Sequence, residues 1–238
     1  IWSDSDMSEL GAPHGASAPR KGVIHTSLHL LLLAWYAKEA RAFPWRKTRD
    51  PYQILVAEVM LQQTGVSRVL PIYNLFLAEF PTLEALADAS TADVIRAWQG
   101  MGYNRRAVNL QRAVRAIVAE HGGTVPQDVD TLLRLPGVGP YTAAAISCFA
   151  FLQPVAVVDT NIRRVLGRLL MGPEPIDLAQ AWRLAEEAMP NEEDASAWSQ
   201  ALMDLGSTVC LSRKPRCAVC PVHDLCIAAP AFVSEAAH

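Results

Sequence analysis

The chain has 238 residues, of which 51% are hydrophobic and 19% charged, the balance of an ordinary globular protein with one or two domains. The apolar run at residues 30–36 is much too short to span a bilayer and makes a poor secretion signal, which excludes a membrane protein and favours an intracellular one. The net charge of −3 argues weakly against a nucleic-acid partner.

The predicted elements are all helices. Residues 1–22 are rich in Ser, Gly, Pro and Ala, and we expect this N-terminal tail to be disordered. Beyond it, apolar residues recur at helical spacing, and glycines, prolines and capping residues mark the segment ends. No stretch alternates convincingly as a strand would, so we predict an all-α protein. The expected helices are 23–42, 52–64, 66–80, a short one from 82, 91–98, 104–121, 131–135, one after Tyr141, 162–170, 179–189 and 195–209.

Charge is unevenly distributed along the chain. Five arginines and no acid fall between residues 96 and 115, and Arg105 and Arg106 are among them. Acids concentrate instead at residues 186–194. This distribution predicts a basic face on an acidic body, which suits a nucleic-acid partner, although a solvated helix face is the better explanation for any single cluster.

Residues 135–142 (LPGVGPYT) are expected to join two helices through a tight turn. Gly137 and Gly139 allow backbone angles that are closed to other residues. A turn of this kind before a helix leaves backbone N–H groups free to bind a phosphate. For the turn taken alone, an ordinary helix connection with a glycine C-cap is the alternative.

Two acids are candidates for chemistry. Glu58 is a lone acid in the mostly apolar segment 57–64, where burial would raise its pKa and make it a general acid near neutrality. A partly buried glutamate satisfied by a hydrogen bond is the alternative. Asp159 follows the apolar residues 155–158 and should emerge near the turn. The two would form the carboxylate pair that glycosidic cleavage uses, one protonating the leaving group and the other stabilising the sugar cation.

Four of the five cysteines lie within the last thirty residues with the spacing C-x6-C-x2-C-x5-C: Cys210, Cys217, Cys220 and Cys226. Disulfides are not expected in a chain without a secretion signal, so thiolates this dense indicate a metal site. A structural zinc ion and an iron–sulfur cluster both suit four cysteines. The fifth, Cys148, lies in an apolar helix and is expected to be a small buried hydrophobe.

Read on through Val158-Asp159-Thr160-Asn161, the turn resembles the helix-hairpin-helix motif of DNA repair glycosylases. The cysteine spacing resembles the iron–sulfur loop of the endonuclease III and MutY superfamily, which implies a [4Fe–4S] cluster rather than zinc. Further segments in the same order resemble MutY-type adenine DNA glycosylases over residues 28–228. These segments are Phe43-Pro44-Trp45, Pro51-Tyr52, Glu58-Val59-Met60-Leu61-Gln62-Gln63-Thr64, Gly100-Met101-Gly102-Tyr103 and Leu202-Met203-Asp204-Leu205-Gly206.

The resemblance also implies a two-lobed fold. We expect a six-helix barrel at residues 45–153 that contains the hairpin. The iron–sulfur domain is expected to be discontinuous, with residues 23–44 joined to residues 154–230. The active site would then lie in a DNA cleft between the lobes. The expected partner is double-stranded DNA with a mismatched or damaged base pair, bound by a monomer that is cytoplasmic and nucleoid-associated.

The resemblance assigns roles residue by residue. Glu58 would protonate the adenine at N7, and Asp159 would stabilise the cation at C1′. The supporting catalytic residues are Tyr141 and Asn161. Two residues would wedge into the duplex beside the flipped base, Gln63 and Tyr103. Other DNA contacts are expected from the hairpin and from the basic run, at Gly137, Val138, Gly139, Arg105 and Arg106.

Position 141 also bears on the reaction. Endonuclease III-like relatives have a lysine there that forms a Schiff base and cuts the strand, whereas this chain has Tyr141. We therefore expect a monofunctional base excision repair glycosylase with weak or no strand cleavage, releasing adenine paired with 8-oxoguanine or guanine. The alternatives are a thymine or uracil mismatch glycosylase acting opposite guanine, and a non-catalytic DNA-binding protein.

Several departures from the MutY pattern are also visible. Gly65 and Asn104 stand where family members often have glutamine and tyrosine. The Tyr103–Ala107 segment is more similar to the thymine mismatch glycosylases, whereas the Gln62-Gln63 pair is more similar to the adenine glycosylases. The sequence ends soon after Cys226, so we expect a short form without the C-terminal domain that recognises 8-oxoguanine in MutY enzymes. Selectivity for 8-oxoguanine is therefore left open.

Overall fold

The computed structural model describes residues 21–235, with side chains described for residues 26–232. Over this range the chain is helical and contains no strand, which confirms the predicted all-α class. None of the described helices is both long and apolar enough to cross a membrane. The predicted disordered tail at residues 1–22 lies outside the described residues except for its last two positions, which begin the first helix.

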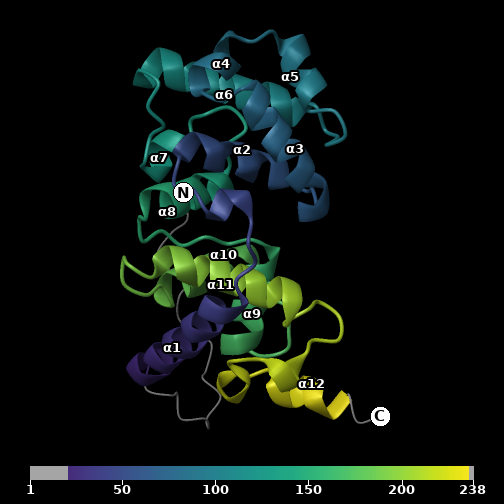
Figure 1. The fold of residues 1–238 in the computed structure, drawn as a ribbon. Helices are drawn as coiled ribbons and strands as arrows, with labels where there is room; N and C mark the ends of the chain where they lie inside the picture. Colours follow the sequence, from purple (N-terminus) through teal and green to yellow (C-terminus); the bar gives the residue numbers. More distant parts are fainter. Residues whose placement is uncertain (1–20, 236–238) are drawn as a thin grey trace, which may run out of the picture.

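The helices follow one another with short connections (Figure 1). They are α1 (Lys21–Glu39), η1 (Pro44–Arg46), α2 (Pro51–Leu61), α3 (Val66–Glu79), α4 (Leu83–Asp88), α5 (Thr91–Ala97), α6 (Arg105–His121), α7 (Val129–Leu132), α8 (Pro140–Phe151), α9 (Thr160–Leu170), α10 (Leu178–Glu187), α11 (Ala195–Thr208), η2 (Cys217–Val219), η3 (His223–Leu225) and α12 (Ala229–Glu235). The sequence predicted none of η1, η2, η3 and α12.

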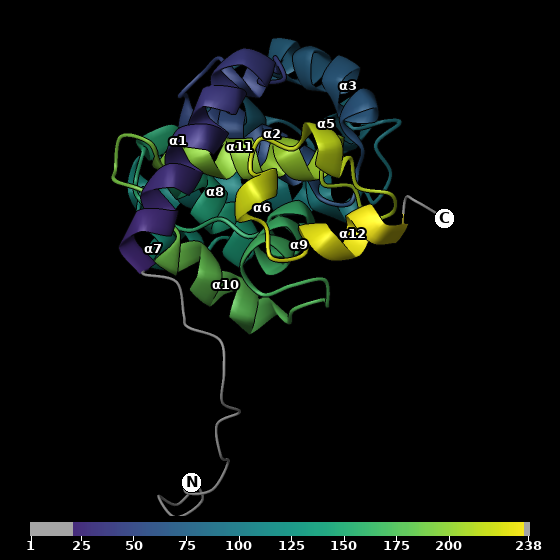
Figure 2. The same cartoon turned by 90° about the horizontal axis from the view of Figure 1, so that it is seen from below.

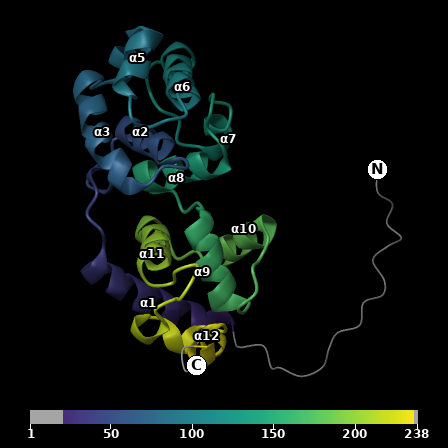
Figure 3. The same cartoon turned by 90° about the vertical axis from the view of Figure 1, so that its right-hand side faces the viewer.

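Two hydrophobic cores divide the described chain. The first is built from side chains of η1 and α2–α8 and includes the fully buried Trp98. The second is built from α1, α9, α10 and α11 and includes the almost fully buried Trp198. The two groups of helices lie one above the other in Figure 3, with α2–α8 in one and α1 and α9–α12 in the other.

The chain passes between the two groups of helices more than once. It starts in the second group, where α1 packs along α11 (Figure 2), and it enters the first group at η1. It returns after α8, through the extended residues 152–159 that lead into α9. A third, small cluster joins the groups, since Cys148 and two alanines of α8 contact Val157 and Ala195.

The central helices of the first group are α2 and α8, which pack against each other. Almost every side chain of α2 from Tyr52 to Met60 is buried, and a helix that is apolar on all sides belongs in a core. It begins where Asp50 accepts hydrogen bonds from the N–H groups of Tyr52 and Gln53. This placement carries Glu58 into the interior of the protein.

Candidate active site

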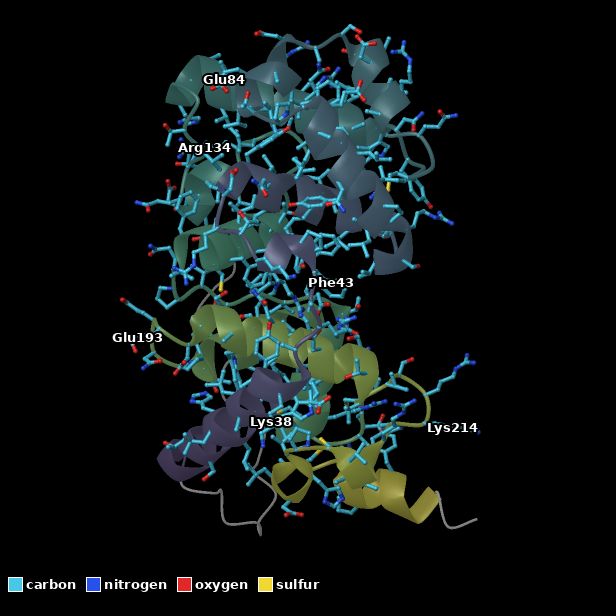
Figure 4. All side chains as sticks on the ribbon, in the orientation of Figure 1. Lys38, Phe43, Glu84, Arg134, Glu193 and Lys214 are labelled. Carbon is cyan, nitrogen blue, oxygen red and sulfur yellow. The ribbon has the colours of Figure 1, made fainter. Side chains whose placement is uncertain are left out.

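A pocket of about 720 Å³ is lined by residues of both groups of helices. It lies where the chain crosses between them, and Phe43, one of its lining residues, projects at this junction in Figure 4. Predicted site residues from α2 and the loop after it, from α8 and from the start of α9 meet in it. They are Glu58, Gln63, Tyr141, Asp159 and Asn161.

Glu58 enters the pocket from α2 as a buried acid that is only 4% exposed. Its Oε2 atom has no hydrogen-bond partner within the described part of the chain. Burial raises the pKa of Glu58 to about 7, nearby Asp159 raises it further, and the Tyr141 hydroxyl and Arg46 oppose the shift. The carboxyl group can therefore hold a proton near neutral pH and has a free oxygen to present it.

Tyr141 lies in the first turn of α8 and hydrogen bonds to Glu58. Burial raises the pKa of Tyr141 well above its ordinary value, and the carboxylates of Glu58 and Asp159 raise it further. The hydroxyl therefore stays protonated and acts as a donor to Glu58.

Asp159 is the N-cap of α9, a role that was not recognised in the sequence. Its Oδ1 accepts a 2.6 Å hydrogen bond from the Ile162 N–H, and its Oδ2 accepts one of 2.8 Å from Asn161 Nδ2. The N-terminus of a helix carries partial positive charge, which favours a carboxylate there. The two acids of the pocket thus have opposite surroundings, since Glu58 is among apolar side chains and Asp159 is at a helix N-terminus.

Asn161 is held from behind by Arg164, whose Nη2 donates 2.9 Å to Asn161 Oδ1. The same guanidinium donates to the carbonyls of Gly206 and Cys210. Gly206 is required at its position, because a Cβ atom there would lie 2.6 Å from the Cβ of Asn161. The orientation of Asn161 therefore depends on close packing of α9 against α11.

A buried carboxylate that sequence reasoning missed lies beside this pocket. Asp204 of α11 is fully buried, and it pairs with Arg41 at 2.6 Å and with Arg46 at 2.7 Å. Both arginines line the pocket, so Asp204 fixes two cations at its edge. These contacts also pull the Asp204 pKa below its ordinary value, against the effect of burial. In the sequence, a lone acid within the apolar segment 201–205 is the feature that could have indicated this buried carboxylate.

Gln63 and Tyr103 are both exposed, and both adopt the left-handed backbone conformation, with φ of +53° and +48°. A residue other than glycine costs about 1–2 kcal/mol in this conformation. The expected helix over residues 52–64 therefore ends early, at Leu61. Tyr103 lies between the left-handed Gly102 and the start of α6.

The two arginines of the predicted DNA-binding pair point to different places. Arg105 is exposed and available to a phosphate. Arg106 is half-buried, and its guanidinium is committed to internal acceptors on two loops. A direct phosphate contact by Arg106, as the sequence suggested, does not agree with this geometry.

The hairpin turn has the expected tight geometry. Gly137 has φ of +80°, and a Cβ atom there would lie 2.7 Å from the Cβ of Asn109. Gly139 is extended and has open space around it. Val138 contributes a buried side chain to the first core, and its N–H donates to the Leu135 carbonyl, so its predicted contact with DNA is not supported. Gly139 is the N-cap of α8, whose N-terminus can receive an anion.

The four clustered cysteines line a second, smaller pocket, together with Arg168 and Phe232. None of the four forms a disulfide bond within the described part of the chain. Within residues 21–235, no three His, Cys, Asp or Glu side chains converge closely enough to hold one metal ion.

Comparison with protein families identifies the fold. A family described as the HhH-GPD superfamily of base excision DNA repair proteins matches residues 56–190, which is more than half of the chain. The chain belongs to this superfamily. A second family, the iron-sulfur binding domain of endonuclease III, matches residues 210–226. The resemblance noted in the sequence and the helix-hairpin-helix glycosylase fold are thereby confirmed.

Curated relatives are named as DNA glycosylases. The adenine DNA glycosylase of Mycobacterium tuberculosis is 48% identical over 199 residues, covering 80% of this chain and 64% of the relative. The human adenine DNA glycosylase is 40% identical, and the alignment covers 91% of this chain and 45% of the human protein. The thymine/uracil-DNA glycosylase of Methanothermobacter thermautotrophicus is 35% identical, covering 82% and 90%. This chain thus spans less than two thirds of the length of the adenine glycosylases described here.

Solved structures agree on the fold. A thermostable thymine-DNA glycosylase superposes with a TM-score of 0.81 at 32% identity, covering 87% of this chain and 97% of the other. A non-covalent complex of endonuclease III with DNA superposes with a TM-score of 0.75 at 23% identity, covering 88% of this chain and 98% of the other.

The cofactor follows from the match to the iron–sulfur domain. The matched segment contains Cys210, Cys217, Cys220 and Cys226, the four residues that the sequence predicts as ligands of the cluster. This chain therefore carries a [4Fe–4S] cluster, as predicted, and not a structural zinc ion. When bound, the cluster ties four points of residues 210–226 together.

Proposed function

We propose that this chain is a monofunctional DNA glycosylase of base excision repair that hydrolyses the N-glycosidic bond of adenine mispaired with 8-oxoguanine or guanine. One observation carries the proposal. The buried Glu58 has an unpartnered oxygen and a pKa raised to about 7, and it shares a pocket with Asp159 at a helix N-terminus. This pairing supplies an acid and a carboxylate at neutral pH.

In the proposed reaction, protonated Glu58 donates its proton to N7 of the adenine. The glycosidic bond then breaks, its electron pair leaves with the base, and positive charge develops at C1′. Asp159 stabilises this charge, and its carboxylate is fixed by a hydrogen bond from Asn161, which Arg164 holds in turn. Water then attacks C1′ and gives up a proton that restores protonated Glu58, which leaves an abasic site.

The absence of strand cleavage is part of the proposal. Among the residues that the structure describes, none of those lining the pocket is a lysine. Tyr141 occupies the hairpin position and is hydrogen bonded to Glu58. No amine is therefore available to form a Schiff base with C1′, which supports a weak lyase activity or none.

The proposed substrate is double-stranded DNA with a mismatched base pair, bound by a monomer at the nucleoid. Gly137, Gly139 and Arg105 would contact the backbone, and Gln63 and Tyr103 would enter the duplex. The six-helix barrel at 45–153 and the iron–sulfur domain at 23–44 plus 154–230 would then flank the DNA, in keeping with the two cores.

A second candidate is release of thymine or uracil opposite guanine. The thymine/uracil-DNA glycosylase of Methanothermobacter thermautotrophicus favours this candidate, because the alignment covers 82% of this chain and 90% of that enzyme. The mycobacterial and human relatives favour adenine, with identities of 48% and 40% against 35%. We therefore rank adenine first.

Single-turnover base release tests the proposal. The duplexes carry adenine opposite 8-oxoguanine, adenine opposite guanine, thymine opposite guanine, and uracil opposite guanine. The control is Glu58→Gln, which keeps the shape of the side chain and removes the transferable proton. We expect adenine release that the control loses. Release of thymine or uracil alone would support the second candidate, and no release from any duplex would overturn both.

A further inference from the structure

Two loops present the residues proposed to enter the duplex, and each does so in the same unusual way. Gln63 and Tyr103 are the exposed tips of the loops at residues 62–65 and 98–104, and both have left-handed backbones. Few residues other than glycine hold this conformation unless the surroundings enforce it. Something in the structure must therefore fix both loops.

A single side chain reaches both loops. Arg106, in the first turn of α6, donates from Nη1 toward the end of α2 and the first loop, and from Nη2 toward both loops. The bond to the Gln62 carbonyl is the shortest, and the distances to the other five acceptors run from 2.9 to 3.3 Å. The acceptors are the carbonyls of Val59, Met60, Gln62, Met101 and Gly102 and the hydroxyl of Thr64.

The pattern of these bonds is specific. Arg106 binds the carbonyl of Gln62, directly before Gln63, and the carbonyl of Gly102, directly before Tyr103. It therefore fixes the peptide plane that leads into each left-handed residue. The guanidinium also lies 5.6 Å from the centres of the Tyr103 and Trp98 rings, which holds the tyrosine from its face.

We propose that Arg106 is a positioning residue, which holds Gln63 and Tyr103 at a fixed separation so that both enter the duplex together when the base leaves the stack. This inference rests on the proposed function. It replaces the expectation that Arg106 contacts a phosphate. Lysine could not substitute, since one ammonium group lacks the planar fork that serves two loops at once.

The same framework extends to the hairpin through Gln62. Its Nε2 donates 3.2 Å to the Thr142 hydroxyl and 3.5 Å to the Gly137 carbonyl, while its carbonyl accepts from Arg106. Three segments proposed to contact DNA are thus connected through two side chains. Loosening Arg106 should therefore disturb both loops directly and the hairpin only through Gln62.

The first experiment measures amide hydrogen exchange in the free holoprotein, wild type against Arg106→Lys. We expect exchange at residues 62–65 and 98–104 to accelerate about tenfold in the variant, with the distant second core unchanged. Exposed Arg105→Ala is the matched control and should leave both loops as in the wild type. Unchanged exchange in Arg106→Lys would overturn the proposal without reference to any DNA activity.

The second experiment uses DNA. A phosphate contact and a positioning role differ in the salt dependence of binding, because each lost phosphate contact lowers the salt slope by about one. We expect Arg105→Ala to lower the slope, and Arg106→Lys to keep it while slowing base release about tenfold. The slowing of base release in Arg106→Lys should be smaller when the target base lies opposite an abasic site, because moving an unpaired base out of the duplex costs less free energy.

The outcomes separate the two proposals. No base release by the wild type would contradict the proposed function, and the exchange experiment would still decide whether Arg106 holds the loops. Full activity of Arg106→Lys, or a lowered salt slope, would overturn the positioning role. If this variant does not fold, Thr64→Val removes one of the Arg106 acceptors, and we expect faster exchange at residues 62–65 alone.

Discussion

Glu58 is the residue on which the proposed chemistry depends most. A lone acid in an apolar helix is visible in the sequence, so its burial could be predicted. The free Oε2 atom and the hydrogen bond from Tyr141 could not, because they depend on how α8 packs on α2. Asp159 was recognised as an acid near the site, but its role as the cap of α9 was not.

The raised pKa of Glu58 makes protein stability depend on pH. The folded pKa of about 7 lies above the ordinary 4.5, so the folded state binds this proton more tightly than the unfolded chain. The resulting stability is fully present below about pH 4.5 and is lost as pH rises through 7. We therefore expect Glu58→Gln to raise the free energy of unfolding at pH 8 by up to about 3 kcal/mol, at 1.36 kcal/mol per pKa unit.

Urea unfolding of the holoprotein at pH 5, 6, 7 and 8 measures this difference. Near pH 5 the wild type and Glu58→Gln should unfold at similar urea concentrations, because a protonated glutamate and a glutamine differ little in charge. The gap should widen steadily above that pH. Parallel curves for the two proteins across the whole range would mean that Glu58 is charged in the fold.

At the scale of elements, helix identities were largely predictable and their ends were not. Predicted segments such as 104–121 correspond closely to α6, since the apolar period and the two glycines at its end are local signals. Just beyond the early end of α2, the Gln62 carbonyl accepts a hydrogen bond from Arg106 of α6, more than forty residues away in the sequence. The spacing of apolar residues along the sequence carries no information about such a contact.

The hairpin gives a prediction with its own control. Gly137→Ala would place a Cβ atom 2.7 Å from the Cβ of Asn109 and force alanine to φ of +80°, so we expect a loss of about 1–3 kcal/mol in stability. Gly139→Ala meets nothing within 4 Å and is extended, so its stability should stay within about 0.5 kcal/mol of the wild type. Thermal unfolding of the two variants measures both. Equal losses would contradict the assigned turn geometry.

At the scale of the whole molecule, two cores are connected by a few buried polar contacts. Asp204 lies on α11, a helix of the second core, and holds Arg41 and Arg46 on the segment that leads into the first. Removing one partner of such a pair costs more than the pair contributes, because a buried charge is left unmatched. The partners are about 160 residues apart, which is why the acid was visible in the sequence and its role was not.

The two acids of the site also come from different groups of helices. Glu58 belongs to α2, and Asp159 caps α9. The pocket that contains both is lined from either side, so the proposed reaction requires both groups in register. The fold class and the acids could be predicted from the sequence. The opposite surroundings of the two acids required the assembled molecule.

The most direct test of this account is the pH dependence of single-turnover adenine release from a duplex with adenine opposite 8-oxoguanine. Glu58 acts in its protonated form, so we expect the rate constant to be level below about pH 7 and to fall about tenfold per pH unit above it. Glu58→Gln should show no release at any pH. A rate constant that is flat through pH 9, or release that persists in Glu58→Gln, would contradict the assignment of Glu58 as the acid.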